Sequence, residues 1–394
     1  MFLTRRWLFI TAGTAVFLLS SVRSSGSALR FPVGDPSSGS PYTISQKFQD
    51  APFILNGKTI SGHLGEDWAV DVGTNVFPIA PGHVVRSRDF QDNWCKVVII
   101  AHENLVPGRT IYSLYAHLIS ILVGEGDDVI DVTKPIGLSG GPQCGYPPHL
   151  HFEIKEYHSA NITPGSGYTD EPALNVDLLC HNDATFFRPS SFILGQIAIP
   201  SLLGSMSDKF DGDVLNINRW GCLVPPSQGA SVTLADINQH LEVLMGTGVG
   251  GGGIVSQCSI SGDFDVQVDY ILLNWPINNN HSVRLGAYDL GGVGVLRFSA
   301  SSSELYELGP GSTAHTPTND TAGQFRLVRT GSTISGFFRT GSNWTFLGSE
   351  TGATSATRFN LDLGTNGTFA PGGIVVAFDN FQVNAGSSVC PAAP

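Results

Sequence analysis

The feature that most restricts the fold of this chain is a repeated pattern of short β-strands separated by turns. Between residues 264 and 270, in the segment Phe-Asp-Val-Gln-Val-Asp-Tyr, apolar residues alternate strictly with polar ones. Because successive side chains of a strand point to opposite faces, this alternation predicts a strand with one buried face. Short apolar runs, such as residues 97–101, recur between clusters of Gly, Pro and Asp. The sequence therefore predicts an all-β protein.

Composition agrees with this fold class and excludes several classes of protein. Charged residues make up 14% of the chain, well below the roughly 25% of an ordinary soluble domain. The 47 glycines and the scarcity of lysine favour strands and turns over exposed helices. The net charge of −12, without a Lys/Arg cluster after the first residues, argues against a nucleic-acid partner. Collagen-like, coiled-coil and disordered chains have other compositions.

Residues 1–28 are predicted to be an export signal. Arg5 and Arg6 precede a run from Trp7 to Val22 that carries no charge. This run is short for a membrane span and typical of a signal peptide, and small residues suited to cleavage follow it. We therefore expect an exported protein, in the periplasm, at the cell wall or outside the cell, with no membrane attachment after cleavage. An uncleaved anchor is the alternative.

The remaining chain is long enough for two domains, each with its own core. The stretch from Pro189 to Ser207 is uncharged and contains a further proline, so we place the boundary there and expect domains at 29–200 and 201–394. Six cysteines are present, three in each domain, and an exported chain permits disulfides. An odd number per domain leaves at least one cysteine in each either free or bridging to the other domain.

Histidines concentrate in three short motifs of the first domain. These are His63-x-x-x-Asp67, His117 and His149-x-His151. If the last motif lies on a strand, both of its imidazoles point the same way, so one can bind a metal while the other reaches the metal's water. The first motif adds a nitrogen and an oxygen ligand. Two histidines and one carboxylate leave a fourth position open, as in a catalytic zinc site.

A zinc ion held in this way has a defined chemistry. It lowers the pKa of its water to about 7 and polarises a carbonyl group. A neutral histidine beside it accepts a proton and returns the proton to a leaving amine. The residue types and their spacing therefore predict hydrolysis assisted by a metal.

The order and spacing of these motifs resemble the lysostaphin/LytM-type zinc metallopeptidases. The resemblance covers about residues 30–195 and includes further residues beside the motifs: Gly73, Val76, Tyr115, Leu118, Phe152 and Glu153. It implies a β-sheet metallopeptidase domain that cuts peptide bonds in the stems or cross-links of peptidoglycan.

The resemblance also implies a role for each motif residue. The metal ligands correspond to His63, Asp67 and His151, while His117 and His149 assist catalysis. All five positions are retained, so we expect an active enzyme.

Other residues near these motifs receive separate interpretations. Tyr146-Pro147-Pro148 replaces a Gly-containing stretch of the family, and with Cys144 nearby it is expected to reshape the substrate groove. Glu66 is interpreted as a solvated acid. Glu153 is given the same interpretation, with a hydrogen bond to a histidine ring N–H as its alternative. His102 is assigned to the surface or to packing.

The second domain shows the strand pattern most clearly and is predicted to be a jelly-roll β-sandwich. Its opening residues 207–211 and closing residues 376–383 resemble the concanavalin A-like lectin and glucanase sandwiches. No carboxylate pair is spaced as in a glycoside hydrolase, which favours a binding or packing module. Four aromatic residues are interpreted as sandwich core, with stacking on sugar rings as the alternative: Trp275, Tyr288, Tyr306 and Trp344. Four residues are interpreted as turn-forming, with calcium binding as the alternative: Asp208, Asp211, Asp379 and Asn380.

The sequence thus predicts an exported zinc metalloendopeptidase that acts on peptidoglycan, with a sandwich that binds glycan or guides the enzyme. Two alternatives stay open. One is a non-enzymatic cell-surface protein that binds glycan or protein, and the other is a peptidase that acts on a protein outside the wall.

Overall fold

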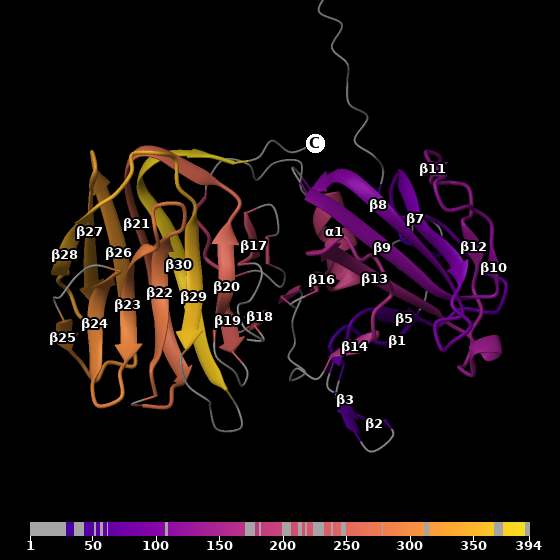
Figure 1. Ribbon diagram of the computed structural model, residues 1–394, viewed down its shortest axis with the longest axis horizontal. Coiled ribbons are helices and arrows are strands. Elements are labelled where there is room, and N and C mark those ends of the chain that lie inside the picture. The colour runs from indigo at the N-terminus through magenta and orange to yellow at the C-terminus, as the bar shows by residue number, and fades with distance from the viewer. Residues whose placement is uncertain are drawn as a thin grey trace, which may run out of the picture.

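In the computed structural model of the chain, strands make up nearly all of the regular structure (Figure 1), which confirms the all-β prediction. The predicted export signal, residues 1–28, lies outside the residues that the structure describes. The described residues are 29–34, 43–50, 53–55, 58–60, 62–106, 109–169, 178–180, 183–198, 206–211, 215–216, 219–223, 232–237, 239–245, 250–277, 279–310, 315–365 and 373–390.

The first part of the chain is organised around one antiparallel sheet. Its strands are β1 (Ile44–Gln46), β5 (Glu66–Trp68), β7 (Gly82–Asp89), β8 (Lys96–Val106), β9 (Arg109–Leu118), β11 (Asp128–Val129), β13 (Leu150–Tyr157), β15 (Leu178–Cys180) and β16 (Ala184–Phe187). They are hydrogen-bonded in the order β11-β7-β8-β9-β13-β16-β15, and β5 pairs with both β13 and β1.

Shorter elements surround this sheet. The short strand pairs are β2 (Phe53–Leu55) with β3 (Lys58–Ile60), β4 (Gly62–His63) with β14 (Tyr168–Thr169), and β12 (Gly137–Leu138) with both β10 (Ser120–Ile121) and β6 (Asn75–Val76). A 3₁₀ turn, η1 (Pro142–Cys144), precedes β13.

The apolar run at residues 97–101 forms the start of β8. Val98 and Ile100 pack into the main core, whereas Val97 and Ile99 pack into a separate cluster on the other face of the sheet. Because both faces are covered, the run is continuously apolar instead of alternating.

The helix α1 (Pro189–Ala198) packs against β13. Its first turn is held by Glu66, whose carboxylate accepts hydrogen bonds from the Ser190 amide (3.1 Å) and the Ser190 hydroxyl (2.6 Å). A carboxylate at a helix N-terminus satisfies free N–H groups and interacts favourably with the helix dipole. Glu66 is buried, so its interpretation as a solvated acid is wrong. No helix among the described residues has the length and apolar character needed to cross a membrane.

The second part is a sandwich of two antiparallel layers, as predicted. One layer has the order β18-β19-β30-β21-β26-β27-β28, and the other has the order β17-β20-β29-β22-β23-β24-β25. The first layer consists of β18 (Val232–Ile237), β19 (His240–Met245), β21 (Ser259–Asn274), β26 (Ala322–Thr330), β27 (Thr333–Arg339), β28 (Thr345–Thr351) and β30 (Ile374–Val389). The second consists of β17 (Trp220–Cys222), β20 (Gly250–Ser256), β22 (His281–Ala287), β23 (Val293–Ser299), β24 (Glu304–Gly309), β25 (His315–Pro317) and β29 (Phe359–Thr365).

Aromatic rings fill the space between the two layers. Tyr270 stacks on Phe325 with ring centroids 4.4 Å apart, and Tyr306 stacks on Phe338 at 4.0 Å. The hydroxyls of Tyr270 and Tyr306 hydrogen-bond to each other across the sandwich. The interpretation of Tyr306 as a core residue is confirmed, because its ring is fully buried, and its alternative, stacking on a sugar ring, is wrong.

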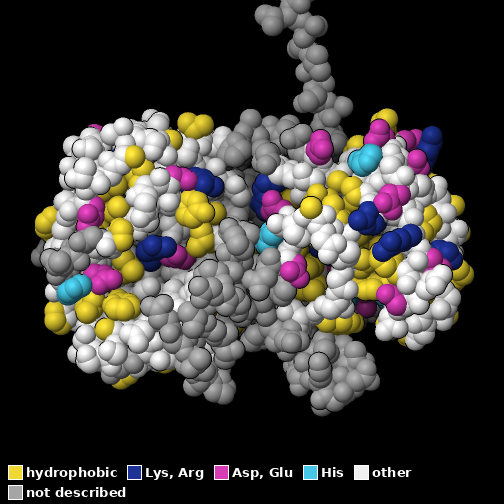
Figure 2. Space-filling model, in the orientation of Figure 1, with side chains coloured by type: hydrophobic (Ala, Val, Ile, Leu, Met, Phe, Trp, Pro, Cys, Tyr) yellow, Lys and Arg dark blue, Asp and Glu magenta, His cyan; other side chains and the backbone are white. Residues whose placement is uncertain are grey.

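The other three aromatic candidates retain some exposure, and each has an arginine over its ring. Trp275 and Trp344 are half-buried, and Tyr288 is 38% exposed. Arg297 lies over Trp275, Arg358 lies over Tyr288, and both Arg326 and Arg339 lie over Trp344. On the face shown in Figure 2, acidic and basic side chains are interspersed over both parts of the molecule.

The two parts are joined by backbone pairing and by a disulfide. β15 of the first part pairs with β18 of the sandwich, so one sheet continues from one part into the other. In Figure 1, β17, β18 and β19 lie on the side of the sandwich nearest the first part. The Cys180–Cys222 disulfide links the parts, while Cys95–Cys144 and Cys258–Cys390 each close within one part. This is the bridging arrangement that three cysteines per part left open; the domain limits 29–200 and 201–394 stay a prediction.

His102 is a buried packing residue in β8. Its ring donates a hydrogen bond through Nδ1 to the Pro81 carbonyl (2.8 Å) and accepts one at Nε2 from the Ser113 hydroxyl (2.7 Å). Burial lowers the pKa of His102 from 6.5 to about 4, although the bond to Pro81 opposes the shift. The folded protein therefore keeps this ring neutral at a pH at which an unfolded chain would protonate it.

This shift predicts a loss of stability in mild acid. Between pH 6.5 and 4 the unfolded state binds the extra proton, so the free energy of unfolding falls as the pH falls. From pH 7 to pH 5 the contribution of His102 is about 2 kcal/mol, and no further loss occurs below its folded pKa. Urea unfolding of the wild type and of His102→Gln at pH 7 and at pH 5 measures how much His102 contributes to the loss of stability. An equal pH-dependent loss in the two proteins would contradict the assignment.

Candidate active site

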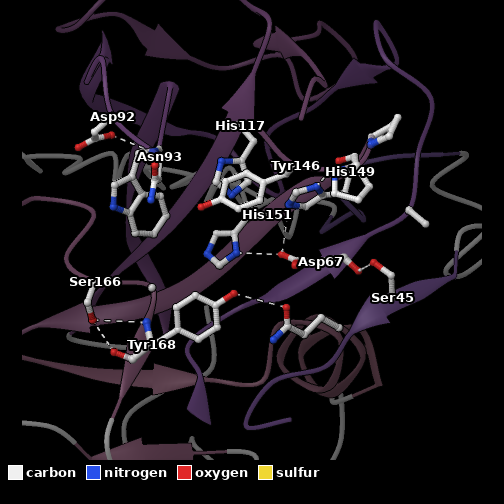
Figure 3. Close-up of a pocket in the computed structure, with 16 residues that line it drawn as sticks. Ser45, Asp67, Asp92, Asn93, His117, Tyr146, His149, His151, Ser166 and Tyr168 are labelled. Carbon is white, nitrogen blue, oxygen red and sulfur yellow. Dashed lines mark hydrogen bonds and ion pairs between the residues drawn. The ribbon is translucent and has the colours of Figure 1, made fainter. Parts of the chain in front are cut away.

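The five predicted site residues meet beside β13, and Figure 3 shows four of them, Asp67, His117, His149 and His151. His63 lies on β4, Asp67 on β5 and His151 on β13. His117 is the penultimate residue of β9, and His149 directly precedes β13. The antiparallel register sets Asp67 opposite His151. Segments that lie far apart in the sequence therefore present these side chains to one another because of strand pairing.

Three ligand-type atoms converge at the centre of the group. His63 Nε2 lies 3.0 Å from His151 Nδ1 and 3.4 Å from Asp67 Oδ1. His151 Nδ1 and Asp67 Oδ1 are 2.9 Å apart. A tetrahedral metal with bonds of about 2.0–2.1 Å separates its ligand atoms by about 3.3 Å. In the part of the chain that the structure describes, this is the only group of three such residues close enough to hold one metal ion. The donor atoms and their spacing fit a zinc ion.

The electrostatics of this centre favour a cation. Burial opposes the charged form of Asp67, but hydrogen bonds from His151 and His63 outweigh it and lower the pKa of the carboxyl well below its usual range. Burial also acts against a charged His151, yet its bonds to Asp67 and Glu153 raise the pKa of the ring to about 9. A proton is therefore held firmly between the ligand atoms, and a metal ion that binds there would displace it.

A buried ion pair stands behind His151. His151 Nε2 lies 3.0 Å from Glu153 Oε1, and Lys155 Nζ lies 2.6 Å from Glu153 Oε2 and 3.1 Å from the Pro164 carbonyl. His151, Glu153 and Lys155 are every second residue of β13, so their side chains lie on the same face of the strand. Each side chain is at most 4% exposed. The interpretation of Glu153 as a solvated acid is thus wrong, and its alternative, a hydrogen bond to a histidine ring, is confirmed.

The two remaining histidines are positioned differently. His149 Nδ1 lies 2.7 Å from the Pro147 carbonyl and donates to it, so Nε2 carries the lone pair and lies 3.7 Å from Asp67 Oδ1. His117 Nδ1 is buried without a hydrogen-bond partner. Burial, followed by the nearby charges of His151 and His149, lowers the pKa of His117 to about 3. The His117 ring is therefore neutral.

These residues open into a cleft of about 700 Å³. Its lining consists of Ser45, Gln46, Asp67, Ala69, Asp92, Asn93, Trp94, His117, Tyr146, Pro147, Pro148, His149, His151, Ser166, Gly167 and Tyr168. Figure 3 shows Tyr146 beside His117 and His149, and Tyr168 on the other side of Asp67. The Tyr146-Pro147-Pro148 segment lines the cleft, in agreement with its predicted effect on the groove.

Sequence reasoning missed Trp94 and Tyr168 as parts of this cleft. Trp94 stacks on His117 with ring centroids 6.1 Å apart, and Tyr168 packs against His63 at 5.2 Å. Burial, then the charge of Asp67, raises the pKa of Tyr168 to about 12, which keeps its hydroxyl protonated. Neither residue lies in a periodic or motif-like segment. For Tyr168 the available signal was an aromatic residue directly after Gly165-Ser166-Gly167, whereas no glycine lies near Trp94 in the sequence.

Comparison with known proteins places this site in a family. Residues 61–164, which contain all five motif residues, match the model of peptidase family M23. This part of the chain is similar to peptidase family M23. The predicted resemblance to LytM-type metallopeptidases is thereby confirmed for this part of the chain.

Relatives of the M23 domain include two curated bacterial proteins. An uncharacterized metalloprotease of Buchnera aphidicola is 30% identical over 173 residues, which cover 44% of this chain and 43% of the relative. The peptidoglycan DD-endopeptidase ShyA of Vibrio cholerae is 34% identical over 127 residues, covering 32% of this chain and 26% of the relative. The chain thus spans less than half the length of either relative. Among solved structures, the catalytic domain of lysostaphin from Staphylococcus simulans is 25% identical, with a TM-score of 0.26 over 33% of this chain and 88% of that domain.

The candidate calcium ligands of the sandwich serve other purposes. Asp208 accepts hydrogen bonds from the Phe210 amide (3.1 Å) and from the Trp220 indole (2.9 Å), which agrees with turn formation. Asp379 accepts a bond from the amide of Asn380 (2.6 Å). The described residues of the sandwich contain no group of three His, Cys, Asp or Glu side chains suited to a metal ion, so the structure does not support calcium binding.

Proposed function

We propose that this protein is an exported zinc metalloendopeptidase that hydrolyses peptide bonds of peptidoglycan. The observation that carries the proposal is the convergence of His63 Nε2, Asp67 Oδ1 and His151 Nδ1 to within 3.4 Å at a cleft of the M23 domain. Two buried nitrogens and one carboxylate oxygen form a donor set that suits zinc and leaves one coordination position for water or substrate. The family match and the relatives that are named proteases support this activity.

His63, Asp67 and His151 would hold the metal. When bound, zinc supplies Lewis-acid chemistry, polarising the scissile carbonyl and making water more acidic. Glu153 accepts a hydrogen bond from His151 Nε2, so when a metal displaces the proton on Nδ1, the lone pair of the His151 ring would lie on Nδ1, facing His63 and Asp67.

His149 and His117 are assigned to proton transfer. The hydrogen bond from His149 Nδ1 to Pro147 leaves the Nε2 lone pair facing the cleft, where it accepts a proton from the attacking water. The neutral ring of His117 lies 4.8 Å from the ring of His149, and its Nδ1 has no partner in the protein. The ring of His117 lines the cleft, and we assign it to a hydrogen bond with the substrate oxygen or leaving nitrogen.

The substrate class is proposed from a relative and from the shape of the cleft. ShyA is named a peptidoglycan DD-endopeptidase, and the rings of Trp94, Tyr146 and Tyr168 form apolar walls suited to a peptide without bulky charged groups. The sandwich is proposed to guide the enzyme, with glycan stacking on the exposed face of Tyr288 as one route.

The deciding experiment is digestion of purified peptidoglycan by the purified protein. We expect peptide fragments in mass spectrometry, their loss on adding a chelator, and their return on adding zinc. The masses of the fragments identify the bond that is cut. If zinc-loaded protein releases no fragments from several wall chemotypes, the wall endopeptidase is ruled out, and a non-wall substrate or a binding role takes its place.

A further inference from the structure

We propose that the Cys95–Cys144 disulfide is a positioning element for His117. The bridge ties together two loops that hold this histidine, residues 89–95 and residues 140–148, and so sustains turnover. The inference rests on the proposed function, because turnover is peptide hydrolysis at the M23 cleft.

The backbone of His117 needs external support. Its φ of +59° lies in the left-handed region, which a non-glycine residue occupies only where its surroundings hold it there. Its amide donates to the Trp94 carbonyl (3.1 Å), and its carbonyl accepts a bond from Gln143 Nε2 (3.0 Å). Each of the two loops thus holds one polar group of the His117 backbone.

The same two loops enclose the His117 ring. Trp94 stacks almost parallel to it, at an interplanar angle of 18°, and Tyr146 packs against it with centroids 4.8 Å apart. Because Nδ1 has no hydrogen-bond partner in the protein, packing between these two rings restricts the rotation of the imidazole. The orientation of the ring therefore depends on the separation of the loops.

The disulfide sets that separation. Trp94 directly precedes Cys95, Gln143 directly precedes Cys144, and Tyr146 follows two residues later. The residues that make these contacts, Trp94, Gln143 and Tyr146, each lie within two positions of a bridged cysteine. The loops are otherwise largely exposed, at Gln91, Asp92, Asn93, Pro142, Gln143 and Gly145, and exposed loops have low local stability. A cross-link between residues 49 apart in sequence restricts their motion strongly.

The metal centre is held mainly by the strands, although Trp94 packs edge-on against the His151 ring with centroids 5.3 Å apart. His63, Asp67 and His151 lie on β4, β5 and β13, and their mutual contacts involve neither loop. The Trp94 indole also donates to the Gly165 carbonyl (3.1 Å), which anchors its loop independently of the bridge. Loss of the disulfide should therefore leave the fold and zinc binding intact and displace His117.

The test compares two variants that each lose one disulfide. In Cys95→Ser/Cys144→Ser we expect kcat to fall about 10–100-fold with KM changed by less than about threefold, since a misplacement of about 1 Å costs up to about 100-fold. Zinc content should stay at the wild-type level, and amide hydrogen exchange should accelerate in residues 89–95 and 140–148. The matched control, Cys258→Ser/Cys390→Ser, removes the bridge within the sandwich and should keep wild-type kcat.

The outcomes separate the two proposals. If the wild type cleaves no peptide, the proposed function fails, and the positioning role fails with it. If the wild type cleaves and the Cys95/Cys144 variant keeps its kcat while exchange in the loops rises, only the positioning role is overturned. If that variant does not fold, Gln143→Ala provides a second test. This change keeps the disulfide and removes the hydrogen bond from Gln143 Nε2 to the His117 carbonyl. A fall in kcat of about 3–10-fold at unchanged zinc content is then expected, and an unchanged kcat would overturn the role.

Discussion

Replacing His151 with alanine is expected to abolish zinc retention and peptide cleavage together. The change removes one of the three converging ligand atoms and leaves two, His63 Nε2 and Asp67 Oδ1, which are 3.4 Å apart. The loss should exceed the roughly 10–100-fold that follows removal of an outer hydrogen-bond partner of a metal ligand. Zinc stoichiometry of the purified variant and its rate of peptidoglycan cleavage measure the two effects.

A surface histidine provides the control for this variant. His83 lies in the same domain, with its side chain 53% exposed and paired with the exposed Asp128. His83→Ala should therefore keep both the zinc and the activity, since exposed ion pairs contribute little. A His151→Ala protein that retains zinc and cleaves peptide at the wild-type rate would disprove the assigned metal centre.

The site could be predicted to the extent that its residues lie in motifs. The spacing of His149 to His151 indicates a shared face, the His63-x-x-x-Asp67 motif offers two further ligands, and the structure brings these side chains together. The place of Trp94 in the site could not be predicted in this way. Trp94 lies in a loop, and its ring packs against His117 and His151, which lie far from it in the sequence. No local pattern encodes such a contact, since it depends on which loops the sheet brings side by side.

Buried acids were the main error of the sequence reasoning. Glu66 and Glu153 were both interpreted as solvated, because an acid at the edge of a short strand is usually exposed. Glu66 is buried because α1, far away in sequence, begins at its carboxylate. Glu153 is buried because Lys155, two residues along the same strand, supplies the opposite charge inside the protein. The partner of Glu66 becomes visible only after the chain has folded, whereas Lys155 stands two residues from Glu153 in the sequence.

The overall fold was predicted better than its connectivity. Alternating and continuous apolar runs indicated the strands, and the strands form a sheet-based first part and a sandwich. The pairing of β15 with β18 was not predictable, because any two exposed strand edges of matching length can pair. Cys180 lies on β15, the strand that pairs with the sandwich, and forms a disulfide with Cys222. This bridge between the two parts leaves no cysteine unpaired, although each part has three.

Glu153→Ala is expected to destabilise the zinc-free protein strongly. The carboxylate is fully buried, and its removal leaves the Lys155 ammonium inside the protein without its opposite charge. Breaking a buried pair in this way costs about 3–5 kcal/mol. His151 also loses the acceptor of its Nε2–H, which fixes the tautomer with its lone pair on Nδ1. Zinc affinity should therefore fall by roughly 10–100-fold as well.

A second change separates the two effects of Glu153. In Glu153→Ala/Lys155→Met the unpaired ammonium is gone, so urea unfolding of the zinc-free protein should recover most of the lost stability. Zinc titration should show that the affinity stays low, because His151 still lacks its acceptor. Glu125→Ala, which removes an exposed partner of Arg86, should change neither quantity. If the double variant regained full zinc affinity along with its stability, Glu153 would only balance the charge of Lys155 and would not orient the metal ligand.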